Sequence, residues 1–139
     1  MDARPLVLVF RTSLLPLSET FIRNQVLALR RWRALLIGLR QVDGLELEQL
    51  PWQLLSSLGM RPVPGLLRTA LRELNLPPPG VRRYLQSLNP TLAHVHFGTD
   101  LVALWPMLDG LRVPILTTLH GYDINIRPEC WRWSWRPSA

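Results

Sequence analysis

Three short polar clusters follow apolar stretches that we expect to be buried β-strands, and they carry groups suited to acid–base chemistry or anion binding. The clusters are 18–20 (Ser-Glu-Thr), 96–100 (His-Phe-Gly-Thr-Asp) and 120–123 (His-Gly-Tyr-Asp). In an open parallel sheet, ligands bind outside the carboxyl ends of the strands. Clusters that are remote in the sequence then meet at one edge of the sheet, and we expect a shared site there.

His120 is the residue in these clusters best suited to catalysis. An imidazole beside Gly121 and close to Asp123 can hold a hydroxyl or a phosphate, or act as an acid or base. The first cluster opens a predicted helix, whose free N–H groups suit an anion such as phosphate. His94 and His96 share one face of their strand, but their spacing implies no third ligand, so we expect no metal site.

Each of these residues also has a structural interpretation. Ser18 and Glu19, taken alone, are more typical of a helix cap than of a binding site. His94 is expected to be a hydrogen-bonded structural histidine, and Tyr122 could simply pack. The prediction of a site therefore depends on the combination of the three clusters.

The elements that position these clusters alternate between strands and helices. The predicted strands cover 6–10, 34–39, 92–97 and 113–119. The predicted helices cover 19–32, 66–74, 81–88 and 101–108. We expect Ser18 to cap the first helix, after a loop over 11–17, and Thr99 or Asp100 to cap the last. Residues 41–64 stay unassigned and could hide one further strand. The pattern predicts an α/β fold: a Rossmann-like open parallel sheet flanked by helices.

The composition fits one domain of ordinary size. The chain has 139 residues, of which 47% are hydrophobic and 19% charged, so it can form a core. No apolar run approaches the roughly 18 residues of a spanning helix, and the N-terminal apolar stretch is too short for a signal peptide. The lone Cys130 excludes an intrachain disulfide and a cysteine-based zinc site. We therefore expect a cytoplasmic protein.

The net charge is +6, and all 16 basic residues are arginine. The chain has neither the aromatic signature of an RNA-binding module nor a helix-turn-helix pattern, so we do not expect nucleic-acid binding. A positive surface near the expected site could attract an anionic membrane surface, and a solvated helix face is an equally open interpretation. The arginines concerned are Arg23, Arg30, Arg31, Arg33, Arg68, Arg72, Arg82 and Arg83.

Three segments together resemble the N-terminal half of a family 4 glycosyltransferase: 18–25 (SETFIRNQ), 94–98 (HVHFG) and 120–123 (HGYD). Within the family, the likeness is to bacterial enzymes of exopolysaccharide and colanic-acid-type assembly. The resemblance implies a GT-B architecture, in which two Rossmann-like domains enclose the active site. It implies retaining transfer from a nucleotide-sugar donor, used as a substrate, to a saccharide or lipid-linked saccharide. It implies no cofactor and no obligatory metal.

The resemblance also implies roles for individual residues. His120 matches a catalytic histidine that helps to position the transferring sugar. Ser18 and Glu19 match a loop that faces the cleft, where many relatives carry glycines instead. Asp123 matches a polar position beside the catalytic histidine, and His96 matches a histidine at a strand end. The substrate-binding residues implied in this way are Ser18, Glu19, His96, Gly98, Gly121 and Asp123.

The expected domain organisation is a single acceptor-side domain over 1–127 and a Trp/Arg-rich tail over 128–139 that is unlike the family. A frameshift or premature stop would explain this tail, and a genuinely short protein is the other explanation. Because 139 residues cannot hold two such domains, we expect the donor-binding domain to be absent and this chain to be inactive alone. The alternative function is a non-enzymatic Rossmann-like binding module with a basic face for a membrane or protein partner.

Overall fold

The computed structural model describes residues 2–55, 66, 77 and 80–125. Its centre is a five-stranded sheet in the order β3-β2-β1-β4-β5, with every neighbouring pair parallel. The strands are β1 (Leu6–Leu14), β2 (Arg33–Gln41), β3 (Trp52–Leu54), β4 (Leu92–His96) and β5 (Ile115–Thr118). The helices are η1 (Leu17–Glu19), α1 (Thr20–Ala28), α3 (Val81–Ser87), α4 (Gly98–Leu108) and α5 (Gly121–Asn125). The predicted Rossmann-like α/β fold is therefore confirmed.

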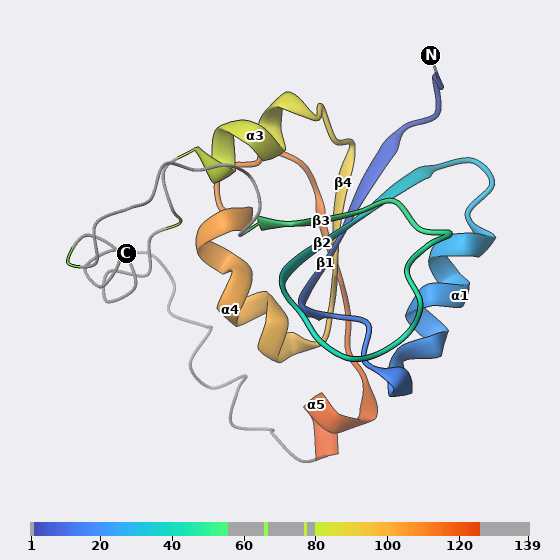
Figure 1. Cartoon of the computed structure of the whole chain (residues 1–139). Coiled ribbons are helices and arrows are strands. Elements are labelled where there is room, and N and C mark those ends of the chain that lie inside the picture. The colour runs from blue at the N-terminus through green and yellow to red at the C-terminus, as the bar shows by residue number, and fades with distance from the viewer. Residues whose placement is uncertain (1, 56–65, 67–76, 78–79, 126–139) are drawn as a thin grey trace.

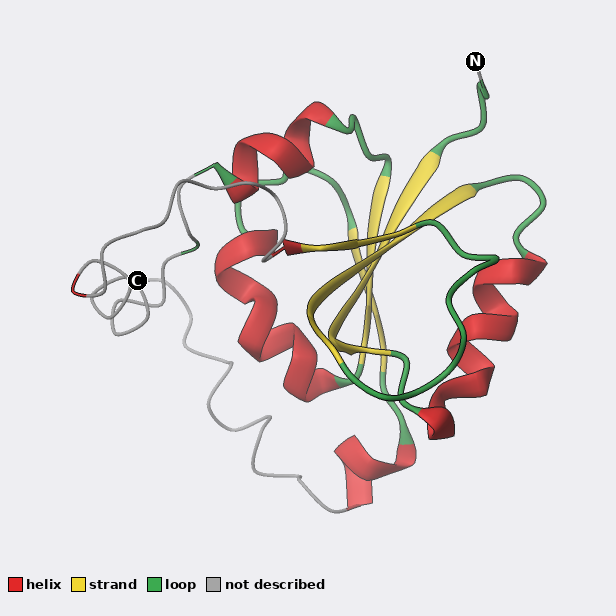
Figure 2. Cartoon of the chain, viewed as in Figure 1, coloured by secondary structure: helices red, strands yellow, loops and turns green. Residues whose placement is uncertain are grey.

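The sheet lies between two helical layers, with α1 on one face and α3 and α4 on the other (Figures 1 and 2). Because successive strand residues point to opposite faces, β1 contributes to both cores. Val7 and Val9 pack with Ile22 and Val26 of α1. Leu6, Leu8 and Phe10 pack in the second core, whose members from α3 and α4 are Val81, Leu85, Leu104 and Leu108.

The strand order creates a switch point between β1 and β4. From β1 the chain passes through α1 to β2 on one side, whereas β4 pairs with the other side of β1. The helices that follow β1 and β4 cover opposite faces of the sheet (Figure 1). The crevice between the carboxyl ends of these two strands is where open α/β sheets bind ligands.

The predicted elements are recovered with shifted ends. β1 continues to Leu14, beyond the predicted end at Phe10, and α1 ends at Ala28 rather than near Trp32. β3 lies in the middle region that the sequence left unassigned. The helix predicted over 66–74 lies outside the described residues, apart from Leu66, which is helical.

The predicted helix caps are wrong. α1 begins at Thr20 with Glu19 at the N-cap position, and Ser18 lies inside the short η1 helix. α4 begins at Gly98, with Phe97 at the N-cap position. Neither cap makes a side-chain hydrogen bond. At α4, the Asp123 carboxylate accepts the Gly98 N–H instead.

Gly44 allows the loop after β2 to pack directly on the end of β1. Its backbone bridges Pro16, and the Leu45 N–H donates to the Leu15 carbonyl at 2.9 Å. A Cβ at position 44 would collide with that same Leu15 oxygen, which belongs to the backbone and cannot move aside freely.

We expect Gly44→Ala to lower the free energy of unfolding by about 1–3 kcal/mol, the usual cost of overpacking. Thermal or urea unfolding measures this. Gly121→Ala is the matched control, because among the described residues a Cβ there meets the Asn125 amide nitrogen alone, at an ordinary contact distance of 3.6 Å. Equal stability of the two variants would contradict the close approach.

Candidate functional site

Three histidines gather at the carboxyl ends of β4 and β5. His96 ends β4, and its Nδ1 lies 3.3 Å from Nε2 of His120, which follows β5. The two rings stack with their centroids 5.6 Å apart. His94 lies two residues before His96 in β4. Its Nε2 contacts the Thr118 hydroxyl at 2.8 Å, and its ring centroid is 4.2 Å from that of His96. His120 is the partly exposed member of this histidine cluster.

All three imidazoles are biased towards the neutral form. Burial, with smaller contributions from His94 and His120, lowers the pKa of His96 to about 3. Burial also lowers the pKa of His94 and, against the attraction of Asp123, that of His120. His96 Nε2 is buried and has no hydrogen-bond partner among the described residues, so charging this ring would be costly. At neutral pH the cluster therefore offers neutral rings, each able to donate and accept a hydrogen bond.

Two phenyl rings surround His120. The Phe97 ring centroid lies 4.3 Å from that of His120, and the Phe21 centroid lies 4.8 Å from it. Phe21 comes from α1 and keeps 42% of its surface exposed. The helix that follows the first polar cluster therefore reaches the third cluster through Phe21. This arrangement offers a ligand an imidazole next to an exposed apolar ring, a mixture common in small-molecule sites.

Asp123 holds the histidine edge in place. One carboxylate oxygen accepts the His120 N–H at 2.9 Å, which caps the start of α5. The other accepts the Gly98 N–H at 3.0 Å, at the start of α4. Asp123 is only 2% exposed, and its two hydrogen bonds connect the starts of α4 and α5. The Gly98 N–H is occupied by one of these bonds.

A buried charged network lies under the switch point. The Arg11 guanidinium in β1 pairs with the carboxylates of Glu19 and Asp100, and all three side chains are less than 10% exposed. It also donates to the His96 carbonyl at 3.2 Å and stacks on the Phe97 ring, 4.3 Å from its centroid. Arg11 therefore connects β1, η1, β4 and α4 directly beneath the histidines.

Asp100 and Glu19 serve this network rather than capping helices. Asp100 accepts the Thr12 N–H and the Thr12 hydroxyl, each at 2.9 Å, so it also fixes the end of β1. Burial raises the pKa of Glu19, although its bond to Arg11 works in the opposite direction. Glu19 faces Arg11, so the expectation that it faces a cleft is wrong.

Strained backbone marks the same place. Phe97, directly after β4, has φ 71°, and Leu15, directly after β1, has φ 31°. Side chains disfavour positive φ, and such residues persist where surrounding contacts hold them, often at functional sites. These two residues flank the switch point. Phe97 is held there by its N–H bond to the Thr118 carbonyl, at 2.9 Å, and by Arg11 on its ring.

The candidate residues from the sequence therefore divide into three groups. His96, His120, Gly98 and Asp123 lie together, as expected from the shared edge. Glu19 joins them only through Arg11. Ser18 and Gly121 are exposed on η1 and α5, where they are free to contact a ligand.

Sequence reasoning gave no role to Arg11 or Phe21, included Phe97 only as part of a cluster, and assigned Asp100 to helix capping. Assigning 11–17 to a loop concealed that Arg11 continues a buried strand. An arginine inside an apolar strand needs a buried carboxylate, and the acidic residues Glu19 and Asp100 were available as partners. That requirement was the usable signal.

Among the described residues, two cavities stand out, one beside the histidines and one remote from them, and His120 lines neither. One, of about 140 Å³, lies between α1 and β4–β5 and is lined by His94, His96 and apolar residues such as Leu116. The other, of about 510 Å³, lies at the amino ends of the strands, far from the histidines. The chemistry identifies the histidine edge as the candidate site, because the larger cavity has no titrating cluster of this kind.

The expected positive surface beside the cleft is not formed by the arginines that follow α1. Arg30 and Arg31 precede β2, and Arg33 begins it, so they lie at the amino edge of the sheet. Arg82 and Arg83 are on α3, and Arg68 and Arg72 lie outside the described residues.

The described residues define the class as a doubly wound α/β domain with a histidine cluster at the carboxyl ends of β4 and β5, next to its switch point. Within 2–55 and 80–125, no group of three or more histidine, cysteine or acidic side chains is arranged to hold a metal ion. No family, no curated protein and no solved structure was found to match the chain.

Proposed function

We propose that this chain is the acceptor-side domain of a retaining glycosyltransferase of polysaccharide biosynthesis. The domain would bind a saccharide or lipid-linked saccharide that receives a sugar from a nucleotide-sugar donor. The observation that carries the proposal is the position of His120. It lies partly exposed beside the switch point, with Phe21 and Phe97 against its ring and Asp123 fixing its backbone.

The geometry gives each side chain a role in this proposal. A neutral His120 imidazole can hydrogen-bond a sugar hydroxyl, and its lowered pKa keeps it neutral at physiological pH. The exposed ring of Phe21 can pack against the apolar face of a pyranose. His96 is a positioning residue in this proposal, because it is buried and contacts the His120 ring. Ser18 and Gly121 would contribute to the rim of the site.

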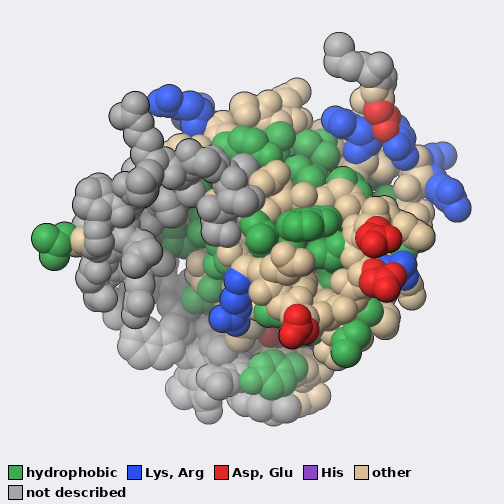
Figure 3. Space-filling view, in the orientation of Figure 1, with side chains coloured by type: hydrophobic (Ala, Val, Ile, Leu, Met, Phe, Trp, Pro, Cys, Tyr) green, Lys and Arg blue, Asp and Glu red, His purple; other side chains and the backbone are tan. Residues whose placement is uncertain are grey.

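The proposal includes a cytoplasmic location with peripheral contact at the inner membrane. The arginines at the amino edge of the sheet suit anionic headgroups, which attract each well-placed arginine with about 1 kcal/mol. Figure 3 shows such basic side chains beside the N-terminal end of the chain. No helix among the described residues is long and apolar enough to cross a bilayer.

A non-enzymatic binding module is the alternative, and the burial of Glu19 and Asp123 favours it. Two of the candidate polar residues are fully engaged by Arg11 and by backbone N–H groups. That leaves His120 with few polar neighbours that could contact a substrate. A module of this kind would bind a protein partner and ignore both saccharides and nucleotide sugars.

Titration calorimetry on the purified 139-residue chain separates these functions. Probes are maltose and cellobiose as acceptors and UDP-glucose and GDP-mannose as donors. We expect the saccharides to bind, and His120→Ala to weaken binding at least tenfold, since it removes the one exposed imidazole. Binding rather than turnover is the readout, because an acceptor-side domain forms one wall of a two-domain cleft.

Arg112→Ala is the matched control, since Arg112 is exposed and precedes β5 at the opposite edge. It should leave saccharide affinity within twofold of the unmodified chain. Absence of binding by every sugar probe would favour the binding module. Equal losses in the two variants would remove the role of His120.

A further inference from the structure

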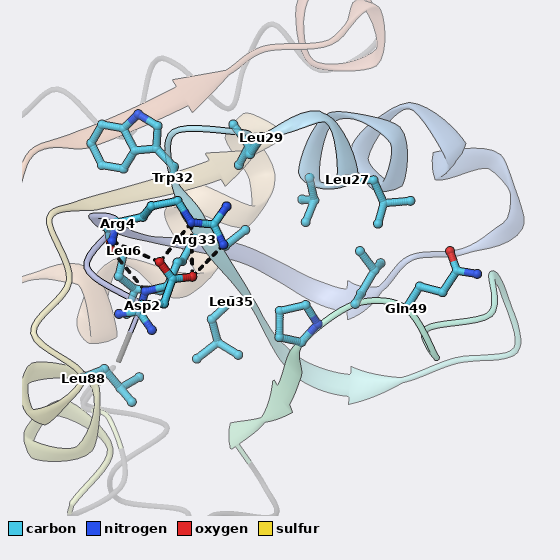
Figure 4. Close-up of a pocket in the computed structure, with 14 residues that line it drawn as sticks. Asp2, Arg4, Leu6, Leu27, Leu29, Trp32, Arg33, Leu35, Gln49 and Leu88 are labelled. Carbon is cyan, nitrogen blue, oxygen red and sulfur yellow. Dashed lines mark hydrogen bonds and ion pairs between the residues drawn. The ribbon is translucent and has the colours of Figure 1, made fainter.

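The cavity at the amino edge of the sheet is the feature that the proposed glycosyltransferase function leaves unused. Its volume is about 510 Å³, within the range of pockets that hold one small ligand. It is formed by the end of α1, the starts of β1 and β2, the segment before β3 and Leu88 after α3 (Figure 4). The histidine cluster lies at the other end of the strands, so the two sites are separate.

The walls of this amino-edge cavity are apolar and remain partly uncovered. Leu27 is 38% exposed, and Leu29, Trp32, Leu35 and Leu88 are each partly exposed around the same hollow. Large side chains of this kind gain about 25 cal/mol for every Å² that is removed from water. Their convergence on a concave surface favours an occupant with an apolar body.

The charged part of the cavity lining is basic on balance. It consists of Arg4, Arg33 and Asp2. Two arginines against one aspartate leave a positive rim above an apolar floor. Such a rim attracts phosphate or carboxylate groups, which guanidinium groups bind in a bidentate manner.

Asp2 shows how an anion fits this rim. The Arg4 guanidinium holds its carboxylate through Nε, at 3.0 and 3.1 Å, and through Nη2 at 2.6 Å. Hydrogen bonds from Arg4 and the nearby charge of Arg33 lower the pKa of Asp2 to about 2. The Asp2 side chain is 40% exposed, so an incoming phosphate or carboxylate can replace it on Arg4 while the walls of the cavity stay in place.

We propose that the amino-edge cavity binds one anionic amphiphile: an alkyl chain against the leucines and Trp32, with its phosphate or carboxylate on Arg4 and Arg33. The headgroup replaces the Asp2 carboxylate, and the chain covers the apolar wall. This site goes beyond the proposed function, because none of the three histidines lines it and the proposed function assigns it no small ligand.

The test measures binding of monomeric dodecyl phosphate, dodecanoate, dodecanol and inorganic phosphate by calorimetry, below the micelle concentration. We expect dodecyl phosphate and dodecanoate to bind at one per chain. Dodecanol lacks the charge and inorganic phosphate lacks the alkyl chain, so each should bind at least tenfold more weakly. Comparable affinity for dodecanol, or for inorganic phosphate, would overturn the proposal.

Variants locate the site within the chain. Arg33→Gln and Leu27→Asn should each weaken dodecyl phosphate binding at least fivefold. Arg83→Gln, which removes an exposed arginine of α3 outside the cavity, should change it less than twofold. Asp2→Asn should tighten binding at least threefold, because the competing carboxylate is gone, and Asp109→Asn is its control.

Two results would overturn the assignment. Equal effects of Arg33→Gln and Arg83→Gln would mean that only net charge attracts the amphiphile. Binding to vesicles of anionic phosphatidylglycerol without binding of monomeric dodecyl phosphate would mean that the rim recognises a membrane surface and that the cavity stays empty. Leu27→Asn changes a partly exposed side chain, so it keeps the test valid if Arg33→Gln fails to fold.

Discussion

Arg11→Met is expected to lower the free energy of unfolding by about 3–5 kcal/mol, the range found when one partner of a buried ion pair is removed. The substitution leaves the carboxylates of Glu19 and Asp100 buried without their counter-ion. It also removes the donor to the His96 carbonyl and the cation above Phe97. We expect the carboxyl edge of the sheet to loosen before the remainder of the domain unfolds.

Urea unfolding of the variant measures this loss. Arg40→Met is the matched control, because Arg40 is exposed and donates to the Ser13 hydroxyl, and its removal should cost less than about 1 kcal/mol. Adding Glu19→Gln to Arg11→Met should recover part of the lost stability, since one buried charge is then neutral. A loss no greater than that of Arg40→Met would show that the charged network contributes little.

The second large effect is expected on acidification. His96 has a pKa of about 3 in the folded chain, against about 6.5 for an exposed histidine. Between these values the unfolded chain binds a proton that the folded chain does not. The contribution of His96 to stability is therefore complete above about pH 6.5 and is lost as the pH falls, by up to about 1.4 kcal/mol per pH unit.

Unfolding of the parent chain and of His96→Gln between pH 7 and 4 tests this dependence. His94 and His120, whose pKa values are also lowered, add to the loss with the same sign. Glu19, whose pKa is raised, acts in the opposite direction, but it is present in both chains and cancels in the comparison. We expect a shallower slope for His96→Gln, and two parallel profiles would contradict the burial of a neutral His96.

Much of the fold could be predicted from apolar patterning. The continuous runs around Val7, Leu36 and Val95 are typical of strands buried on both faces, and each became a strand of the sheet. The boundaries were less predictable, because tertiary contacts set them. Arg11 reads as the start of a loop until its buried partners are known, and those partners keep β1 extended to Leu14.

The location of the candidate site could be predicted from the sequence, but the contacts of its side chains could be predicted only in part. The rule that strand ends share an edge correctly joined His96, His120 and Asp123. It could not show that Asp123 turns towards backbone N–H groups, because a carboxylate one turn into a helix suits capping and ligand binding equally. The rule also could not place Phe21 beside His120, because that contact depends on how α1 packs on the sheet.

The most direct test of the central claim, that the histidine edge binds a saccharide, is the imidazole NMR spectrum of the chain during titration with maltose and cellobiose. The sequence contains three histidines, and all three lie in the cluster, so every ring signal reports on the candidate site. We predict that the His120 signals shift on binding and that those of His96 follow through the contact between the two rings. Ring signals of His120 and His96 that stay unchanged at saturating saccharide would contradict the account.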